Sequence, residues 1–216
     1  RVILGDDGGA SVSFDAGRSW STLLNQPTAE IYRVTTDNHF PYRVYGSQQD
    51  NSTLALPHRS ERGALSMQES YDIGGGESGY IAVRPDDPNI VYSSDLPGLG
   101  ITRYDHRNFQ LREIGPWGEP GAWDKLELRY RFNWCVPVKL SPHDPNVLYS
   151  AAQYVFRTTN EGQSWDIISP DLTTADPSKM IITGGPVQFE DALAYAYPSI
   201  SSVAESPAER GVIWVG

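Results

Sequence analysis

The chain has 216 residues and a formal net charge of -10, with 39% hydrophobic residues, 20 glycines and 16 prolines. A negative surface repels a phosphate backbone, so no nucleic-acid partner is expected. No stretch reaches the roughly 18 apolar residues of a membrane span or forms an N-terminal signal peptide, and the single cysteine, Cys135, precludes a disulfide within the chain.

An octet at residues 13–20, SFDAGRSW, is the first recognisable element, and it recurs at residues 158–165 as TTNEGQSW. Both copies follow the rule hydroxyl-x-Asp/Asn-x-Gly-x-Ser-Trp. The Asp or Asn side chain suits acceptance of backbone N–H groups, the glycine suits a positive φ, and the tryptophan buries a large ring. We therefore expect a tight β-hairpin at each octet, built by the following residues: Ser13, Asp15, Gly17, Trp20, Thr158, Asn160, Gly162 and Trp165.

A second repeat consists of an apolar strand, a turn rich in Pro, Asp and Asn, and another strand. Its clear copies are IAVRPDDPNIVY at residues 81–92 and VKLSPHDPNVLY at residues 138–149, and weaker copies lie at residues 32–45 and 203–214. The copies recur about every 50 to 65 residues, near the upper end of the period of a propeller blade. No helical periodicity fills the gaps between them, which disfavours a helical solenoid.

The repeats divide the chain into one partial propeller domain. A half blade is expected at 1–24, complete blades at about 30–75, 78–128 and 132–190, and another half blade at 198–216. Two explanations of the open ends compete: the chain is a fragment of a larger propeller, which we favour because free half blades expose strand edges, or the two halves close into a fourth blade. Pairing of residues 2–4 with residues 212–215 would decide for closure.

The octets resemble the Asp-box, or BNR repeat, found in sialidases, xyloglucanase-type glycosidases and sortilin-type receptors. Other segments are similar to large secreted bacterial proteins with sortilin-like propellers: residues 5–15, 25–30, 42–51, 74–80, 101–107 and 141–149. The resemblance implies an all-β fold, a β-propeller of four-stranded antiparallel blades, of which this chain holds about three full blades and two half blades. It also implies a secreted, periplasmic or cell-surface location, with the signal outside this sequence.

Polar residues that precede the innermost strands of a propeller converge on one face, where ligands bind. Glu77, in a glycine-rich loop, is the sharpest candidate for an acid, a base or a hydrogen-bond acceptor for sugar hydroxyls. Asp50 is the candidate second carboxylate, beside Gln48 and Gln49, whose amides suit carbohydrate or peptide recognition. The competing interpretation makes Glu77 a partner of a neighbouring backbone group and the glycines part of an inter-blade turn.

The other expected ligand-binding residues are aromatic or basic: Arg131, Trp134, Trp117 and Trp123. An exposed tryptophan beside carboxylates would stack on sugars, whereas a buried one belongs to the blade core. The four histidines are isolated, so no metal and no cofactor are expected. Cys135 lies in an aromatic context and is expected to be a buried small hydrophobe rather than a nucleophile.

Three functions compete at this level. The leading hypothesis is a recognition or scaffold platform for a protein, peptide or glycan, and the second is a xyloglucanase-like glycoside hydrolase with two carboxylates. The third is a structural subunit whose open blade edges are covered by the remaining blades of the protein or by partner chains. The sequence leaves open whether the chain is an enzyme.

Overall fold

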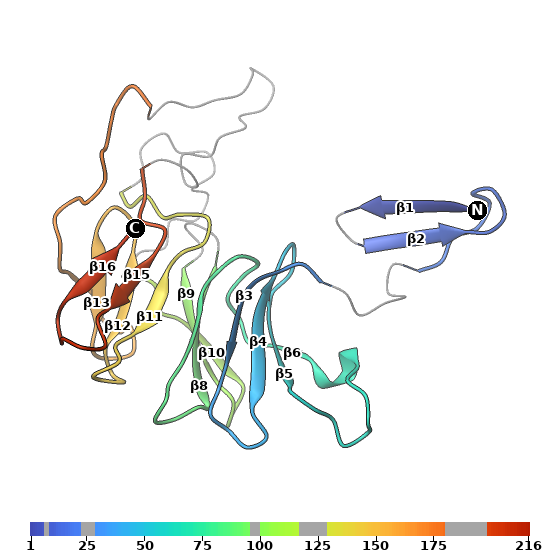
Figure 1. The fold of residues 1–216 in the computed structure, drawn as a ribbon, viewed down its shortest axis with the longest axis horizontal. Coiled ribbons are helices and arrows are strands. Elements are labelled where there is room, and N and C mark those ends of the chain that lie inside the picture. The colour runs from blue at the N-terminus through green and yellow to red at the C-terminus, as the bar shows by residue number, and fades with distance from the viewer. Residues whose placement is uncertain (7–8, 23–28, 96–99, 117–128, 180–197) are drawn as a thin grey trace.

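The structure is a computed structural model, and it describes residues 1–6, 9–22, 29–95, 100–116, 129–179 and 198–216 (Figure 1). The first four-stranded sheet contains β3 (Ile31–Thr36), β4 (Arg43–Gln48), β5 (Thr53–Pro57) and β6 (Tyr71–Asp72). The second contains β7 (Ile81–Val83), β8 (Ile90–Ser94), β9 (Ile101–Asp105) and β10 (Gln110–Glu113). The third contains β11 (Val138–Leu140), β12 (Leu148–Ala151), β13 (Val155–Thr158) and β14 (Asp166–Ile167).

Two further hairpins flank these sheets. They pair β1 (Val2–Asp6) with β2 (Gly9–Ser13), and β15 (Val203–Glu205) with β16 (Ile213–Val215). A short 3-10 helix, η2 (Met67–Glu69), lies between β5 and β6. None of the helices in the described part of the chain is long and apolar enough to cross a membrane.

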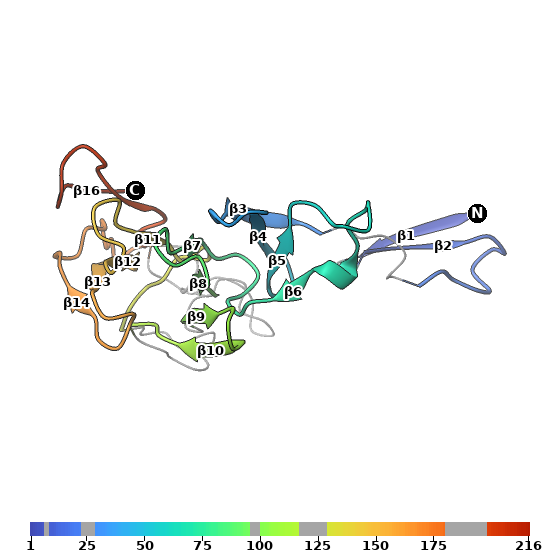
Figure 2. The same cartoon turned by 90° about the horizontal axis from the view of Figure 1, so that it is seen from below.

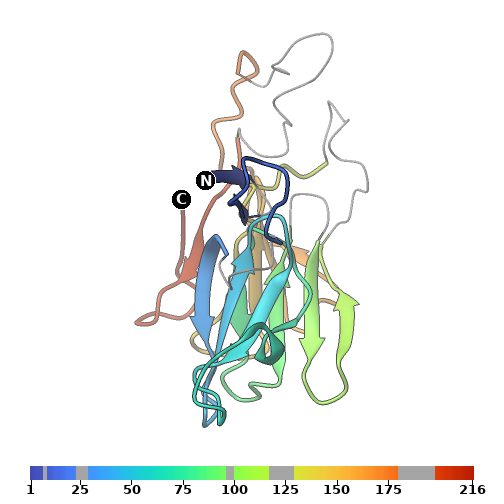
Figure 3. The same cartoon turned by 90° about the vertical axis from the view of Figure 1, so that its right-hand side faces the viewer.

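Each four-stranded sheet is an antiparallel meander in chain order, from β3 to β6, from β7 to β10 and from β11 to β14. The first strands of the three sheets pack side by side: β7 packs against β3 and β11, and β11 packs against β15. In the views of Figures 2 and 3 the sheets follow one another around these inner strands. This arrangement confirms the prediction of an all-β, propeller-type array of four-stranded antiparallel sheets.

Burial follows the position of a strand between the inner edge and the rim. All residues of β8 and β12 are buried, because both faces of these strands are covered by neighbouring sheets, whereas β10 at the rim is exposed along its whole length. Side chains alternate across each strand, so neighbours in sequence serve different cores. Val91 joins the core toward the first sheet, with Tyr45 and Tyr104, while Tyr92 joins the core toward the third, with Leu148.

A hydrogen-bonded chain of ring side chains joins the first two sheets. His106 lies in the β9–β10 turn. Its Nε2 is 3.1 Å from the hydroxyl oxygen of Tyr45, and its Nδ1 is 3.1 Å from the hydroxyl oxygen of Tyr71. The Tyr45 hydroxyl donates to Asp37 Oδ2 at 2.9 Å, so it accepts from His106 Nε2–H, and His106 Nδ1 accepts from Tyr71. Burial lowers the pKa of His106 to about 4, which favours this neutral ring.

The first octet forms one compact turn after β2. Ser13 Oγ donates to Asp15 Oδ1 at 2.9 Å and accepts from Gly17 N at 2.8 Å, and Asp15 Oδ1 also accepts from Ser19 N at 2.8 Å. Gly17 has a φ of 88°, as its place in the rule requires. The hydrogen bonds from Ser19 and Ser13 hold the pKa of Asp15 at about 2.

The second octet repeats this turn between β13 and β14. Thr158 Oγ1 donates to Asn160 Oδ1 at 2.9 Å and accepts from Gly162 N at 3.0 Å, and Asn160 Oδ1 accepts from Ser164 N at 3.0 Å. Gly162 has a φ of 77°. Asn therefore does in the second octet what Asp does in the first, because the shared acceptor is a single side-chain oxygen.

The tryptophans of the two octets have different surroundings. Trp165 packs against two hydrophobic cores, and its Nε1 donates to Ile114 O of the second sheet at 2.6 Å. Trp20 donates to Gly17 O within its own turn at 3.2 Å and is 44% exposed. The ring burial expected at Trp20 is therefore not seen, because none of the described sheets packs against the first octet as the second sheet packs against the second octet.

The terminal hairpins remain separate. β1 pairs with β2, and β15 with β16, and no pairing joins residues 2–4 to residues 212–215, all of which are described. In Figure 1 the β1–β2 hairpin lies apart from the sheets and the C-terminal hairpin lies beside the third sheet. The closure of both hairpins into one blade is not realised, and the division into blades and half blades remains a proposal.

Candidate functional site

The connections that enter β7, β11 and β15 lie at one end of the sheets, together with the β4–β5 turn; we call this end the entry face. Hydrogen bonds tie these connections to one another. Ser78 Oγ donates to Trp134 O at 2.7 Å, and Asn133 Nδ2 donates to Ser199 Oγ at 3.2 Å. Segments far apart in sequence thus form one cross-linked surface.

Three of the predicted site residues meet on this face. Glu77 is only 8% exposed, and its Oε2 accepts from Asp50 N at 2.6 Å and from Gln49 Nε2 at 2.7 Å. Burial raises the pKa of Glu77, and the nearby Asp50 carboxylate raises it further, against the opposing effect of the Asp50 backbone N–H. The carboxyl group therefore anchors the β4–β5 turn to the loop that enters β7.

The Gln49 amide stands between the two predicted carboxylates. Its Nε2 donates to Asp50 Oδ1 at 2.9 Å as well as to Glu77 Oε2. A glycosidase places the scissile bond between two carboxylates about 5 to 10 Å apart. In this structure a single amide nitrogen bridges the two carboxylates, so both are engaged within the protein.

The glycines around Glu77 are explained by close packing. A Cβ atom at Gly79 would overlap the backbone carbonyl of Ser94, and one at Gly76 would overlap the side chain of Asp95. The loop therefore lies directly on the end of β8, where no larger residue fits. This packing accounts for these two glycines without a ligand.

The remaining predicted residues differ in their surroundings. Arg131 is engaged: its Nε donates to Pro198 O at 3.1 Å, and its Nη2 donates to Asp171 Oδ2 at 2.8 Å. Trp134 and Gln48 are half-buried on the entry face. Trp117 and Trp123 lie outside the described residues.

Sequence reasoning missed Gln153, which is 3% exposed. Its Oε1 accepts from Arg131 N at 2.8 Å and its Nε2 donates to Arg129 O at 3.0 Å, so it positions the loop before β11. An amide between the apolar residues Ala152 and Tyr154 was the available signal, because a buried amide needs backbone partners.

No group of three or more His, Cys, Asp or Glu residues in the described part of the chain is arranged to hold a metal ion. Cys135 is half-buried. Burial raises the pKa of its thiol, so the thiolate that nucleophilic catalysis requires is disfavoured there.

Comparisons with known proteins give the following. No protein-family model matches the chain, and no curated protein matches it. Among solved structures, a GH74 xyloglucanase from Xanthomonas campestris is 18% identical with a TM-score of 0.49; the match covers 99% of this chain and 33% of the xyloglucanase. A putative 6-phosphogluconolactonase from Bacteroides fragilis is 13% identical with a TM-score of 0.40, covering 71% of this chain and 46% of that one.

The extracellular domain of a putative hybrid two component system from B. thetaiotaomicron is 10% identical with a TM-score of 0.35, and the match covers 99% of this chain and 30% of that domain's chain. The matches thus cover less than half the length of each of these three structures. Its class of fold, a propeller-type array, follows from its own strand pairing and from the packing of its inner strands.

Proposed function

We propose that this chain is an Asp-box β-propeller module whose entry face is a rigid recognition platform for a glycan or peptide outside the cytoplasm. The observation that supports recognition over catalysis is the Gln49 amide, which is hydrogen-bonded to both Asp50 and Glu77. It turns two potential catalytic carboxylates into one fixed network. The hydrogen bonds between entry loops supply the rigidity that preorganises a binding surface.

The groups available to a ligand on this face are polar and planar. Asp50 and Asn51 are exposed at the tip of the β4–β5 turn, and Gln48 and Trp134 are half-buried on the same face. Carboxylate and amide groups match sugar hydroxyls and peptide bonds, and an indole ring offers a stacking surface. A glycan or an extended peptide fits this set.

A glycoside hydrolase is the second candidate, and the raised pKa of Glu77 favours it. A carboxyl group that holds its proton more tightly than usual is better suited to protonate a leaving-group oxygen. That mechanism would require the Gln49 side chain to leave its position between Glu77 and Asp50.

A structural subunit is the third candidate. Trp214 on β16 is 70% exposed, and among the described strands β16 pairs only with β15. An apolar strand edge of this kind suits the addition of a strand from another blade or from a partner chain.

Calorimetric titration tests the recognition function, with soluble plant and bacterial polysaccharides and unstructured peptides as ligands. We expect at least one to bind, and Asp50→Asn, which tolerates the φ of 56° at that position, to weaken binding about tenfold through the lost charged hydrogen bond. Trp134→Ala should weaken it similarly. Gln110→Ala, on the exposed rim strand β10, is the control and should bind like the unsubstituted chain. Equal binding by all variants would exclude the entry face.

A further inference from the structure

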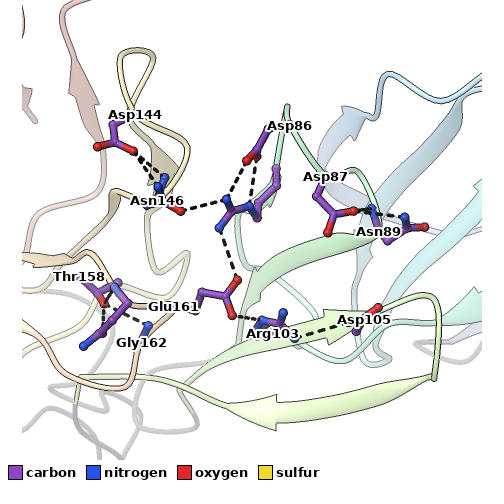
Figure 4. Close-up of polar contacts among 12 residues, drawn as sticks. Asp86, Asp87, Asn89, Arg103, Asp105, Asp144, Asn146, Thr158, Glu161 and Gly162 are labelled. Carbon is purple, nitrogen blue, oxygen red and sulfur yellow. Dashed lines mark hydrogen bonds and ion pairs between the residues drawn. The ribbon is translucent and has the colours of Figure 1, made fainter.

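A polar cleft of about 440 Å³ lies between the second and third sheets, at the end of the strands opposite the entry face. It is formed by the β7–β8, β9–β10 and β11–β12 turns and by the second octet (Figure 4). Its volume lies within the range of about 300 to 1,000 Å³ typical of small-molecule sites. Its lining consists mainly of arginine, carboxylate, amide and hydroxyl side chains.

Arg84 forms a fixed wall of this cleft. Its side chain is 10% exposed, and its Nε and Nη2 donate to both oxygens of Asp86 at 3.1 and 2.8 Å. Nη2 also donates to Asn146 Oδ1 at 3.0 Å, and Nη1 donates to Glu161 Oε1 at 3.4 Å. This guanidinium is occupied and has little capacity left for a ligand.

Arg103 differs from Arg84. Its side chain is 16% exposed, and its Nε lies 2.9 Å from Glu161 Oε2, yet the buried Nε–H forms no hydrogen bond with any described residue. The Asp105 carboxylate is 4.0 Å from Nη1, beyond hydrogen-bond distance. A largely buried guanidinium with poorly aligned acceptors carries a desolvation cost that a well-placed acceptor would offset.

The charges of the cleft limit the ligand that it fits. Three arginines of the lining, Arg84, Arg103 and Arg107, lie beside four carboxylates: Asp86, Asp87 and Glu161 of the lining, and Asp105, which pairs with Arg107. This balance disfavours a ligand that carries more than one negative charge, in a chain whose net charge is -10. A planar monocarboxylate matches the fork of N–H donors of a guanidinium.

We propose that this cleft binds a small carboxylate-bearing ligand, with the carboxylate held by Arg103. Arg107 stands at the mouth, where its side chain is 56% exposed and where it already pairs with Asp105 and Asp87 at 2.8 and 3.2 Å. Thr159 and Gln163 of the second octet are exposed on the wall and offer hydrogen bonds to hydroxyl groups of the same ligand. An acidic monosaccharide and an acidic amino acid share this chemistry.

The test is titration of the chain with sodium glucuronate, sodium glutamate and glucose, followed by NMR. Glucuronate should bind and glucose should not; saturation by glutamate as well would identify the carboxylate alone as the recognised group, whereas glucuronate alone would identify the acidic sugar. Arg103→Gln should weaken binding at least about tenfold, as expected for a lost charge-assisted hydrogen bond. Equal binding of glucuronate and glucose would overturn the proposal.

Matched variants distinguish a loss of binding from a loss of the folded structure. Arg112→Gln removes another arginine that contacts Glu161 but lies outside the cleft lining, and it should leave glucuronate affinity unchanged. Arg107→Gln alters a side chain that is 56% exposed, and it should reduce affinity several-fold. Unchanged affinity in folded Arg103→Gln and Arg107→Gln would refute the site. Asp50→Asn on the entry face should not affect the affinity for glucuronate. A failure of the cleft proposal can therefore be distinguished from a failure of the proposed recognition at the entry face.

Discussion

At the scale of single residues, the entry face shows how far a sequence locates a site. The proximity of Glu77 to Asp50 could be anticipated, because loops at one end of a propeller converge. The position of the Gln49 amide between them could not, because it depends on a side-chain rotamer and on the left-handed backbone at Asp50, where φ is 56°. Burial and the Asp50 charge raise the pKa of Glu77, which predicts how stability depends on pH.

A raised carboxyl pKa means that the folded chain binds its proton more tightly than the unfolded chain does. Stability conferred by the protonated form is therefore lost as the pH rises from the ordinary value of 4.5 through the raised pKa of Glu77. Glu77→Gln should remove this dependence, so that the variant gains stability relative to the unsubstituted chain as the pH increases. Urea unfolding at a series of pH values measures it; parallel profiles for the two chains would contradict the prediction.

His106 has the opposite pH dependence. Its pKa is lowered from 6.5 to about 4 by burial, so its neutral form stabilises the fold above pH 6.5 and that contribution is lost as the pH falls toward 4. After allowance for solvent screening, the loss should be about 1–2 kcal/mol. His106→Gln should be less stable than the unsubstituted chain at pH 7, and the difference should shrink at pH 4. His143→Gln is the control, because His143 is exposed and contacts Ser206 O at the protein surface. A difference independent of pH would refute this account of His106.

At the scale of elements, the octets and the strand–turn–strand repeat predicted the local structure well. The sequence did not show that β1 is equivalent to the second strand of a complete sheet. β1 pairs with the strand that leads into the first octet, as β12 pairs with the strand that leads into the second. β16 likewise follows the first strand of its sheet, β15, and no described pairing joins the two terminal hairpins.

The two octet glycines offer a matched comparison. Both have positive φ, which costs a residue with a side chain about 1 kcal/mol. A Cβ at Gly17 would meet only Trp20, at 3.8 Å, whereas one at Gly162 would lie 2.5 Å from Ile114 Cβ of the neighbouring sheet. Gly162→Ala should therefore destabilise the chain by about 2–3 kcal/mol, and Gly17→Ala by about 1 kcal/mol or less. Chemical denaturation measures both, and equal effects would argue against inter-sheet packing of the second octet.

Glu161 couples the second octet to the second sheet. Its carboxylate lies 3.4 Å from Arg84 and 2.9 Å from Arg103. Glu161→Gln should cost about 2–3 kcal/mol, because two largely buried guanidinium groups lose a carboxylate partner. Asp166→Asn, which disrupts an exposed pair with Arg157, should cost less than about 0.5 kcal/mol. Thermal unfolding distinguishes them; a Glu161→Gln variant as stable as Asp166→Asn would show that this ion pair does not join the sheets.

At the scale of the whole molecule, the sequence predicted the all-β fold and the succession of four-stranded antiparallel sheets, since the repeats mark the strands and their turns. It could not reveal the charged cleft between the second and third sheets, because Arg84 and Glu161 are separated by 76 intervening residues and meet only through sheet packing. The two ends of the array thus differ in character. The entry face carries cross-tied polar loops, and the opposite end carries the guanidinium-lined cleft.

The function proposed for the entry face is recognition of a ligand without catalysis. The most direct test uses one panel of polysaccharides and two proteins, the unsubstituted chain and Glu77→Gln. For each protein, binding of the polysaccharide and release of reducing sugar are both measured. We predict that a polysaccharide is bound without release of reducing sugar, and that Glu77→Gln binds it equally well, because an amide oxygen still accepts from Asp50 N. Release of reducing sugar by the unsubstituted chain that is abolished in folded Glu77→Gln would contradict this and assign Glu77 a catalytic role.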